Sequence, residues 1–465
     1  MKYYFKIIGL AFLTINSFSF AQNYGAWQQI DSLKEARYSH SAIQLANGNI
    51  LIVSGAGLAD QKDCEIYDIN SKLWSEVTKT NFARGLHRLI MLNSKRVLAV
   101  GSSVTKFCEI YDPVSNKWIL TDTLKVRRVL ALHEIVKLLD GRILAIGGYT
   151  YDYSKLEEQT LRMCEVYDET TDKWSIVDSM KTRRSSHSAT LLKDGKVLVA
   201  GGGISPNPLA SCEIYDPVQN KWINAAPMNI ARENHNAVLL PDGKVLVIAG
   251  YGKDNIFPTR SVELYDPVLD KWKIVDSIKV GESAGSAFIL DDKYILLVGS
   301  NSNQTLIWEI YDYTEFRSKY VGYVNTKSFS NNKIQLVDGR VLVTGGVMTI
   351  NSEIYYPVKT CWIFDKNLTH VEDINNQQES NLIFQNYPNP FNGSTTIKFF
   401  IEKSSNVQIT IYNTLGAKIE DLINERKERG YHEALFSNVS LPSGVYYCRI
   451  VIDKETVTKK LLLIK

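Results

Sequence analysis

A repeated four-residue motif constrains the fold of this 465-residue chain more than any other feature. The motif reads Glu, aliphatic, Tyr, Asp, and a degenerate last copy follows the regular ones. The copies begin at Glu65, Glu109, Glu165, Glu213, Glu263 and Glu309, and the degenerate seventh copy is Glu353 to Tyr356. The mean spacing is about 48 residues, which is the length of one unit in a repeat protein. We therefore expect seven copies of one small β unit to occupy most of the chain.

Glycines recur at fixed places before each copy of the motif. Two apolar strands are joined by Asn-Gly or Asp-Gly, and both residues tolerate a positive φ, so we expect two-residue hairpins. These dipeptides begin at Asn47, Asp140, Asp194, Asp242 and Asp338. The second strand then ends on glycine, which predicts a tight bend or a close backbone approach. Those glycines are Gly55, Gly101, Gly147, Gly148, Gly201, Gly202, Gly250, Gly299, Gly345 and Gly346.

Tryptophan, arginine and histidine recur after each copy. A tryptophan stands seven residues after the motif tyrosine, except in the sixth copy, and we expect it to wedge between neighbouring sheets. The tryptophans are Trp74, Trp118, Trp174, Trp222, Trp272 and Trp362, with Ser318 in the sixth copy. Ten residues after a tryptophan comes an arginine, usually followed by a histidine three residues later. The pairs are Arg37/His40, Arg84/His87, Arg184/His187 and Arg232/His235, and Arg128 is followed by a displaced His133.

Together and in this order, across roughly residues 27 to 364, these marks resemble those of the kelch family. The resemblance implies an all-β fold: a kelch-type β-propeller of about seven four-stranded blades around a channel. Trp27 opens an additional Trp-to-Arg stretch, so its strand is one candidate to complete the last blade. The strand of Trp362 is the other candidate, and the sequence leaves the choice open. The sixth and seventh repeats lack the arginine and histidine.

Four of the six cysteines share one repeat position, immediately before the motif. They are Cys64, Cys108, Cys164 and Cys212. Equivalent places in neighbouring sheets lie about 10 Å apart, which is beyond disulfide reach. We therefore expect buried apolar thiols instead of disulfides.

The first 21 residues have the features of a signal peptide. Lys2 and Lys6 precede an apolar run, and small residues lead up to a predicted cleavage between Ala21 and Gln22. The run is too short to span a bilayer, and no later segment approaches the ~20 apolar residues that spanning needs. We therefore predict an exported chain without a transmembrane segment.

A second domain is predicted after the repeats. We place the propeller at residues 22–364, a polar linker at 365–380, and a small Ig-like β-sandwich at 381–465. The last segment resembles the type A C-terminal sorting domain of the type IX secretion system of Bacteroidota. The matching stretches are Asn386 to Asn392, Ile411 to Gly416, Leu441 to Tyr447, and Lys459 to Ile464. The resemblance implies export through the periplasm by the type IX machinery, then release or attachment at the surface.

The repeated arginines support two interpretations. They would ring one mouth of the channel, beside aromatic residues in the loops that follow the glycines. A site for an anionic sugar or carboxylate would comprise Arg84, Arg128, Arg184, Arg232, Tyr149, Tyr151 and Tyr251. The alternative, which the regular repetition favours, is that each arginine pairs with a motif glutamate and each histidine bonds to backbone, locking adjacent blades.

The kelch resemblance also points to galactose oxidase and sialic-acid mutarotases. The oxidase implies two tyrosines, two histidines and a Tyr-Cys cross-link around copper, but no histidine pair here has metal-ligand spacing. No hydrolase or P-loop motif occurs, so we predict no cofactor, no metal and no catalytic residue. A net charge of +3 without a basic block gives no footprint for nucleic acid. The favoured prediction is a binding or adhesion module for glycan or protein, and the alternative is a carbohydrate-active propeller enzyme.

Overall fold

The computed structural model describes most of the chain from residue 24 to residue 464. The ranges are 24–57, 62–102, 105–128, 134–152, 157–204, 207–253, 258–279, 285–300, 306–324, 331–350, 354–368, 384–387, 391–401, 404–414, 416–428, 430–438, 440–453 and 455–464. The predicted cleavage site at Ala21 and Gln22 and the displaced His133 lie outside them. The chain divides into two compact units, Met1–His370 and Val371–Lys465. No helix long and apolar enough to cross a membrane occurs in the described ranges.

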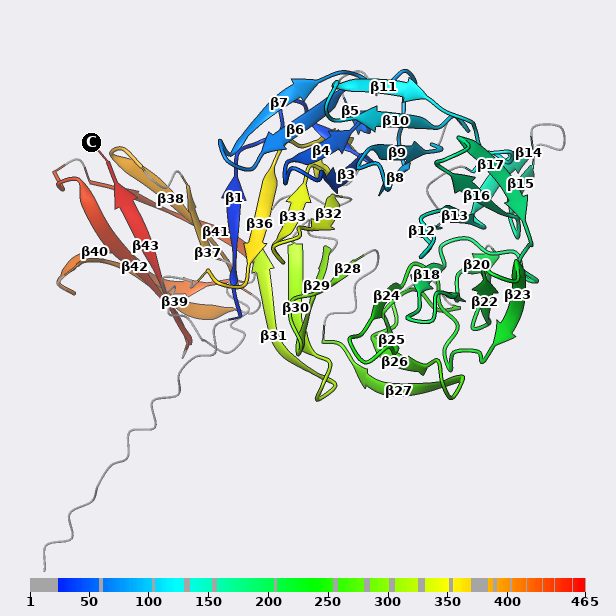
Figure 1. The fold of residues 1–465 in the computed structure, drawn as a ribbon. Coiled ribbons are helices and arrows are strands. Elements are labelled where there is room, and N and C mark those ends of the chain that lie inside the picture. Colours follow the sequence, from blue (N-terminus) through cyan, green and yellow to red (C-terminus); the bar gives the residue numbers. More distant parts are fainter. Residues whose placement is uncertain are drawn as a thin grey trace, which may run out of the picture. The chain divides into compact units, whose positions relative to one another are not determined.

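The first unit holds seven four-stranded antiparallel sheets, which stand in a ring as blades (Figure 1). Blade 1 comprises β3 (Ser41–Gln44), β4 (Ile50–Val53), β6 (Cys64–Asp68) and β7 (Leu73–Val77), and blade 2 comprises β8 (Arg88–Met91), β9 (Val97–Val100), β10 (Glu109–Asp112) and β11 (Lys117–Leu120). Blade 3 comprises β12 (Glu134–Lys137), β13 (Ile143–Ile146), β16 (Cys164–Asp168) and β17 (Lys173–Val177), and blade 4 comprises β18 (Ser188–Leu191), β19 (Val197–Ala200), β22 (Cys212–Asp216) and β23 (Lys221–Ala225). Blade 5 comprises β24 (Asn236–Leu239), β25 (Val245–Ile248), β26 (Ser261–Asp266) and β27 (Lys271–Ser277), and blade 6 comprises β28 (Ser286–Ile289), β29 (Tyr294–Ser300), β30 (Leu306–Asp312) and β31 (Arg317–Val324). Blade 7 comprises β32 (Asn332–Gln335), β33 (Val341–Thr344), β36 (Cys361–Asp365) and the N-terminal β1 (Ala26–Ile30).

The N-terminal strand closes the ring. Residues of β1 pair with β36 along its whole length, and Trp27 lies opposite Phe364. Trp27 therefore takes the outer-strand position that Trp74 takes opposite Tyr67 in blade 1. Trp362, the competing candidate, lies in the third strand of blade 7 and does not close it.

The predicted seventh copy of the motif, at Glu353 to Tyr356, is wrong. Ile354–Pro357 forms β35, which pairs with β34 (Val347–Ile350) in a hairpin outside the blade. The third strand is β36, whose Cys361 lies opposite Thr344 as Cys64 lies opposite Val53. Which segment forms the third strand depends on how it pairs with the second strand, and the residue types of the motif alone do not reveal that pairing register.

The Asp-Gly turns also differ from the prediction. In blade 1, Leu45 N–H donates to Asn49 O (2.7 Å) and Gly48 N–H donates to Leu45 O (3.0 Å). Gly48 has a φ of 90°, whereas Asn47 is not among the residues of positive φ. The loop is therefore three residues long, a type I turn followed by a glycine bulge, and only the glycine needs a left-handed conformation.

Tryptophans of the outer strands pack between blades, as predicted. Trp174 of blade 3 belongs to one buried cluster with Leu98 and Val100 of blade 2. Trp222 of blade 4 packs likewise against blade 3, and its indole N–H donates to Asp178 O of that blade (2.9 Å). Both tryptophans thus fill the space between two sheets, and Trp222 also satisfies its indole N–H at the neighbouring blade.

The cysteines are free thiols and all six are buried, which confirms the prediction that the repeated ones do not form disulfides. Burial raises the pKa of Cys64 and of Cys164 to about 11. A thiol so far from ionisation is an apolar packing group.

The second unit is a β-sandwich, as predicted. One sheet contains β37 (Phe384–Tyr387), β38 (Ser394–Ile401) and β41 (Gly430–Ser437), and the other contains β40 (Lys418–Lys427), β39 (Ser405–Asn413), β42 (Gly444–Ile452) and β43 (Glu455–Leu463). Alternate residues of the two sheets share one buried cluster, among them Ile397, Phe399, Ile409 and Ile450. This alternation is the pattern by which two sheets bury a common core.

Candidate binding face

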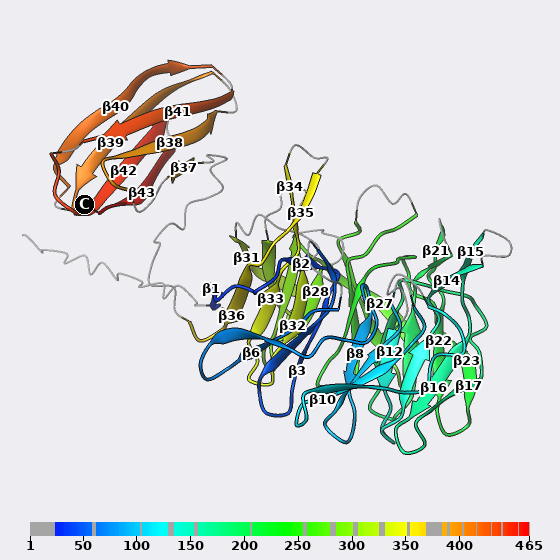
Figure 2. The ribbon, with the colours of Figure 1, turned by 90° about the horizontal axis from the view of Figure 1, so that it is seen from above.

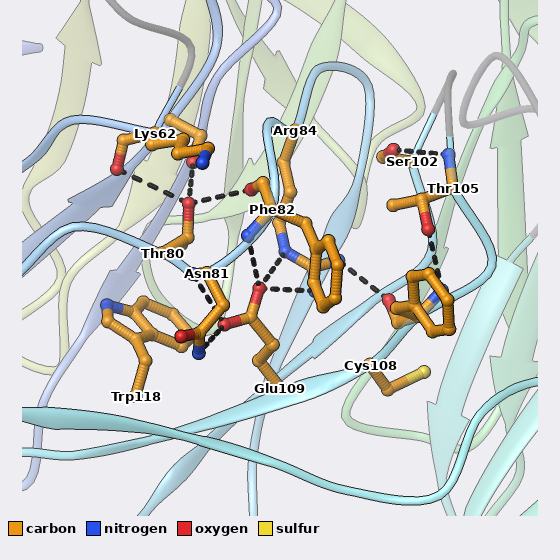
Figure 3. Close-up of polar contacts among 12 residues, drawn as sticks. Lys62, Thr80, Asn81, Phe82, Arg84, Ser102, Thr105, Cys108, Glu109 and Trp118 are labelled. Carbon is orange, nitrogen blue, oxygen red and sulfur yellow. Dashed lines mark hydrogen bonds and ion pairs between the residues drawn. The ribbon is translucent and has the colours of Figure 1, made fainter.

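The repeated arginines lie inside the blades. Arg84 follows the crossover from blade 1 to blade 2, and its side chain is 0% exposed. Its Nη1 donates to Gly101 O and Phe107 O, both at 2.9 Å, and its Nη2 donates to Glu109 Oε1 at 2.7 Å (Figure 3). One guanidinium therefore joins the ends of the second and third strands of its own blade, through charge-assisted hydrogen bonds.

The same ion pair recurs in four further blades. The pairs are Arg37–Glu65 (2.6 Å), Arg128–Glu165 (3.0 Å), Arg184–Glu213 (2.9 Å) and Arg232–Glu263 (2.7 Å). No side chain among them is more than 5% exposed. A pair so buried acts within the fold, since neither charge faces solvent.

Each glutamate also holds the crossover that enters its blade. Glu109 accepts the backbone N–H of Asn81 (2.8 Å) and of Phe82 (3.3 Å), both in the crossover from β7 to β8. Glu213 accepts the N–H of Lys181 and Thr182 in the same way, at 2.7 and 3.0 Å. The carboxylate thus binds the connection to the preceding blade while the arginine binds the strands.

The glycines at the ends of the second strands also join neighbouring blades. The N–H of Gly202 in blade 4 donates to Arg232 O of blade 5 at 2.9 Å. Gly201, with a φ of 59°, lies against the next blade so closely that a Cβ would be 2.6 Å from Arg232 O and 2.9 Å from His235 Cε1. Glycine is required there both by the backbone conformation and by the close approach.

Two of the four described repeat histidines contact side chains, whereas we predicted backbone partners. His40 Nε2 lies 2.8 Å from Thr344 Oγ1 and His235 Nε2 lies 2.9 Å from Ser188 Oγ, in each case across a blade boundary. In the described ranges, neither ring nitrogen of His87 or His187 has a hydrogen-bond partner. Burial, and then the adjacent arginine, lower the pKa of His40 and His235 to about 3, so both rings are neutral at neutral pH.

The predicted tyrosines lie in loops on one side of the ring. Tyr149 and Tyr151 belong to β14 (Tyr149–Asp152), which pairs with β15 (Glu157–Thr160), and Tyr251 exchanges backbone hydrogen bonds with Glu233. Figure 2 shows this hairpin and the β34–β35 hairpin on the same side of the propeller, which we call the hairpin face. Tyr149 and Tyr251 are half-buried. The structure therefore places Tyr149 and Tyr251 in surface loops and the arginines inside the blades.

A stacked phenylalanine pair on the hairpin face is missing from the sequence prediction. The rings of Phe82 and Phe107 are 4.5 Å apart at 21°, and Phe107 is 41% exposed. The crossover carrying Phe82 and the loop carrying Phe107 emerge at the same end of the blade as β14 does in blade 3, because all blades share one topology. Comparison of the repeats could have revealed the pair, since Ser211 and Ser261 stand two residues before the motif glutamate, where blade 2 has Phe107.

Two family models match the chain. The model described as Kelch motif matches residues 138–181, 183–229 and 235–277, which cover most of blades 3 to 5. The model described as Secretion system C-terminal sorting domain matches residues 385–465. The chain is therefore a kelch-repeat β-propeller. More particularly, it is a kelch propeller that ends in a secretion sorting domain, which implies that it is secreted or held at the outer-membrane surface.

Two similar proteins match part of the chain. Kelch-like protein 15 of Homo sapiens is 29% identical over 205 residues, covering 40% of this chain and 33% of that protein. Kelch-like protein 26 of Danio rerio is 27% identical over 156 residues, covering 32% of this chain and 25% of that protein. The chain thus spans a third or less of the length of these relatives.

One similar solved structure is a fungal alcohol oxidase of the AA5 family in complex with copper. It has a TM-score of 0.59 and 15% identity, over 95% of this chain and 100% of the oxidase. At that identity the likeness shows the fold alone. Across the described ranges, no group of three His, Cys, Asp or Glu side chains could hold a metal ion.

Proposed function

We propose that the chain is a secreted or cell-surface binding module, or adhesin, whose hairpin face recognises a glycan or a protein. The observation that carries the proposal is the exposed aromatic pair of blade 2. Phe107 is 41% exposed, whereas the repeated arginines and glutamates are buried. The residues that recur from blade to blade serve to build the ring. In this proposal a ligand is therefore recognised by exposed residues that occur in one blade only.

The Phe82–Phe107 pair is held rigidly. Phe107 O accepts from Arg84, and Phe82 N–H donates to Glu109, so the buried ion pair fixes both backbones that carry the rings. A fixed aromatic face loses little conformational entropy on binding, which favours contact with a sugar ring or an apolar side chain. Tyr149 and Tyr251 of neighbouring loops extend the same face.

A glycan array and a cell-surface protein array, both probed with the full mature chain, test this function. We expect Phe107→Ala to weaken binding tenfold or more, the loss typical of an aromatic anchor. Leu120→Ala is the matched control, because Leu120 is 57% exposed on the outer strand of the same blade. Wild-type affinity in Phe107→Ala would show that the aromatic pair is not the binding site.

We further infer that the chain comes from a member of the Bacteroidota and leaves through the periplasm by the type IX machinery. The sorting-domain match over 385–465 and the signal-like start support this route. In this proposal cleavage after Ala21 leaves a propeller at 22–364, a linker at 365–380 and the sorting domain at 381–465. The domain is then removed, or it anchors the propeller at the surface.

A carbohydrate-active enzyme remains the second candidate. Any sugar that binds on the array can be tested for turnover by the same protein, using mutarotation and hydrogen peroxide release as readouts. Turnover that is saturable in that sugar would replace the binding-module proposal by the enzymatic one.

A further inference from the structure

Glu169 of blade 3 binds the preceding blade through its side chain. Its Oε2 accepts the backbone N–H of Asn93 (3.0 Å) and of Ser94 (3.3 Å), and its Oε1 accepts from Arg96 Nη2 at 3.3 Å. All three donors belong to the turn between β8 and β9 of blade 2. Burial raises the pKa of Glu169, but hydrogen bonds from these residues outweigh burial and leave the pKa below its ordinary value. The turn thus stabilises a carboxylate that the next blade brings to it.

The next pair of blades has an equivalent turn but lacks the glutamate. In blade 3, Arg142 ends the turn between β12 and β13, at the place that Arg96 has in blade 2. The residue of blade 4 that corresponds to Glu169 is Pro217, since each directly follows the aspartate of the motif. A proline side chain has no hydrogen-bonding group. Blade 4 therefore brings no carboxylate to the turn of blade 3.

Three hydrogen-bond donors of the blade 3 turn have no acceptor among the described residues. They are the backbone N–H groups of Leu139 and Asp140 and the Nη1 group of Arg142. The other guanidinium nitrogens of Arg142 contact the Asp140 carboxylate, Nε at 2.8 Å and Nη2 at 2.7 Å. The two backbone N–H groups correspond to those of blade 2 that bind Glu169.

A cavity lies at the place of the missing glutamate. Its volume is about 490 Å³, and it is bordered by the first turns of blades 3 and 4 and by the outer turn of blade 4. Its lining includes Leu139, Arg142, Pro217 and Val218. Leu139 is 72% exposed and Val218 is 93% exposed, so accessible apolar surface lies beside the donors. A cavity of this size can hold a small ligand.

We propose that this cavity binds a carboxylate carried on an aliphatic stem, with the N–H groups of Leu139 and Asp140 and the Arg142 guanidinium as donors. Charge-assisted hydrogen bonds of the same kind hold Glu169 between blades 2 and 3. In the proposed complex the stem contacts Leu139 and Val218. The carboxylate belongs either to a small organic acid or to an acidic side chain of a polypeptide. The cavity lies at the end of the blades away from the hairpin face, so its ligand is independent of the one proposed there.

Titration of the full mature chain with butyrate, followed by ligand-detected NMR, tests the proposal, because butyrate reproduces a glutamate side chain. We expect saturable binding that is absent with neutral butyramide and at least about tenfold weaker in Arg142→Gln. Pro217→Glu, which supplies a glutamate at the place of Glu169, should abolish binding. Pro113→Glu is the matched control, because it makes the same change in blade 2 opposite a turn without arginine, and it should leave binding unchanged.

Asp140 marks the difference between the two turns. It stands where blade 2 has Ser94, whose Oγ accepts from Arg96 Nε at 3.0 Å. The other carboxylates of the lining, Asp194 and Asp216, have equivalents in the site between blades 2 and 3. Asp140→Ser should therefore tighten butyrate binding by about threefold or more, because serine keeps the contact with the arginine and removes a like charge.

Glu169→Ala is the positive control, because it opens the equivalent place between blades 2 and 3. Butyrate should restore part of its Tm. Rescue of Glu169→Ala without any binding to the wild type would overturn the proposal, as would equal binding by Pro217→Glu and Pro113→Glu. Tighter binding of an acetylated Ala-Glu-Ala amide than of butyrate would identify a polypeptide as the source of the carboxylate, and equal binding a small acid.

Discussion

At the residue scale, one arginine acts both within its own blade and on the neighbouring blade. The Arg184 guanidinium joins Gly201 O, Ser211 O and Glu213 within blade 4, while its backbone carbonyl accepts from Gly148 of blade 3. A site for an anionic ligand would need the guanidinium at the surface. The hydrogen bonds that join the strands instead need it buried.

We expect Arg184→Ala to destabilise the propeller by about 3–5 kcal/mol, the cost of leaving a buried carboxylate without its partner. Ligand binding at 25 °C should be unchanged, because the side chain is 0% exposed. Thermal melts beside a binding assay measure both quantities. The neighbouring Arg183, whose side chain is exposed, is the control, and Arg183→Ala should change stability by less than about 0.5 kcal/mol. An unchanged Tm with lost binding would instead restore the arginines as a ligand site.

At the scale of elements, closure depends on a strand from the far end of the sequence. The ring of Trp27 in β1 lies 5.4 Å from that of Phe364 in β36, and both belong to the buried cluster between blades 6 and 7. Strands that pair the two ends of a chain make the ring one cooperative unit, because opening one blade then exposes two interfaces.

Trp27→Ala should therefore cost about 3–5 kcal/mol, since it leaves a cavity at the closing blade. Chemical denaturation followed by tryptophan fluorescence measures the change. Gln28→Ala on the same strand is the control, because Gln28 is exposed and its replacement should be nearly neutral. Equal stability of the two variants would mean that β1 does not hold the ring closed in solution.

At the scale of the whole molecule, the two units have separate cores. Among the described residues, the buried cluster of the sandwich contains only residues from 391 onward. A unit of this kind can be recognised, and removed, without disturbing the other.

Deleting residues 381–465 should therefore leave a folded propeller trapped in the periplasm of a host that has the type IX system. Cell fractionation, with protease resistance as the check on folding, measures the outcome. Full-length Arg183→Ala, expressed in parallel, should reach the medium or the surface. Undiminished arrival of the truncated chain outside the cell would refute the sorting role.

The sequence by itself determined the propeller class, the wedge tryptophans and the buried cysteines, because each depends on a local spacing that recurs along the repeats. It determined the sandwich through the strand pattern and the matching stretches of residues 381–465. The tertiary structure decided which segments pair in blade 7, a question that the spacing of the motifs leaves open. It chose Cys361–Asp365 over Ile354–Pro357 as a blade strand, and β1 as the closing strand, since pairing register is set by the neighbouring strand. The tertiary structure also buries the arginines and exposes Phe107, because the burial of a residue depends on its tertiary neighbours and not on its type alone.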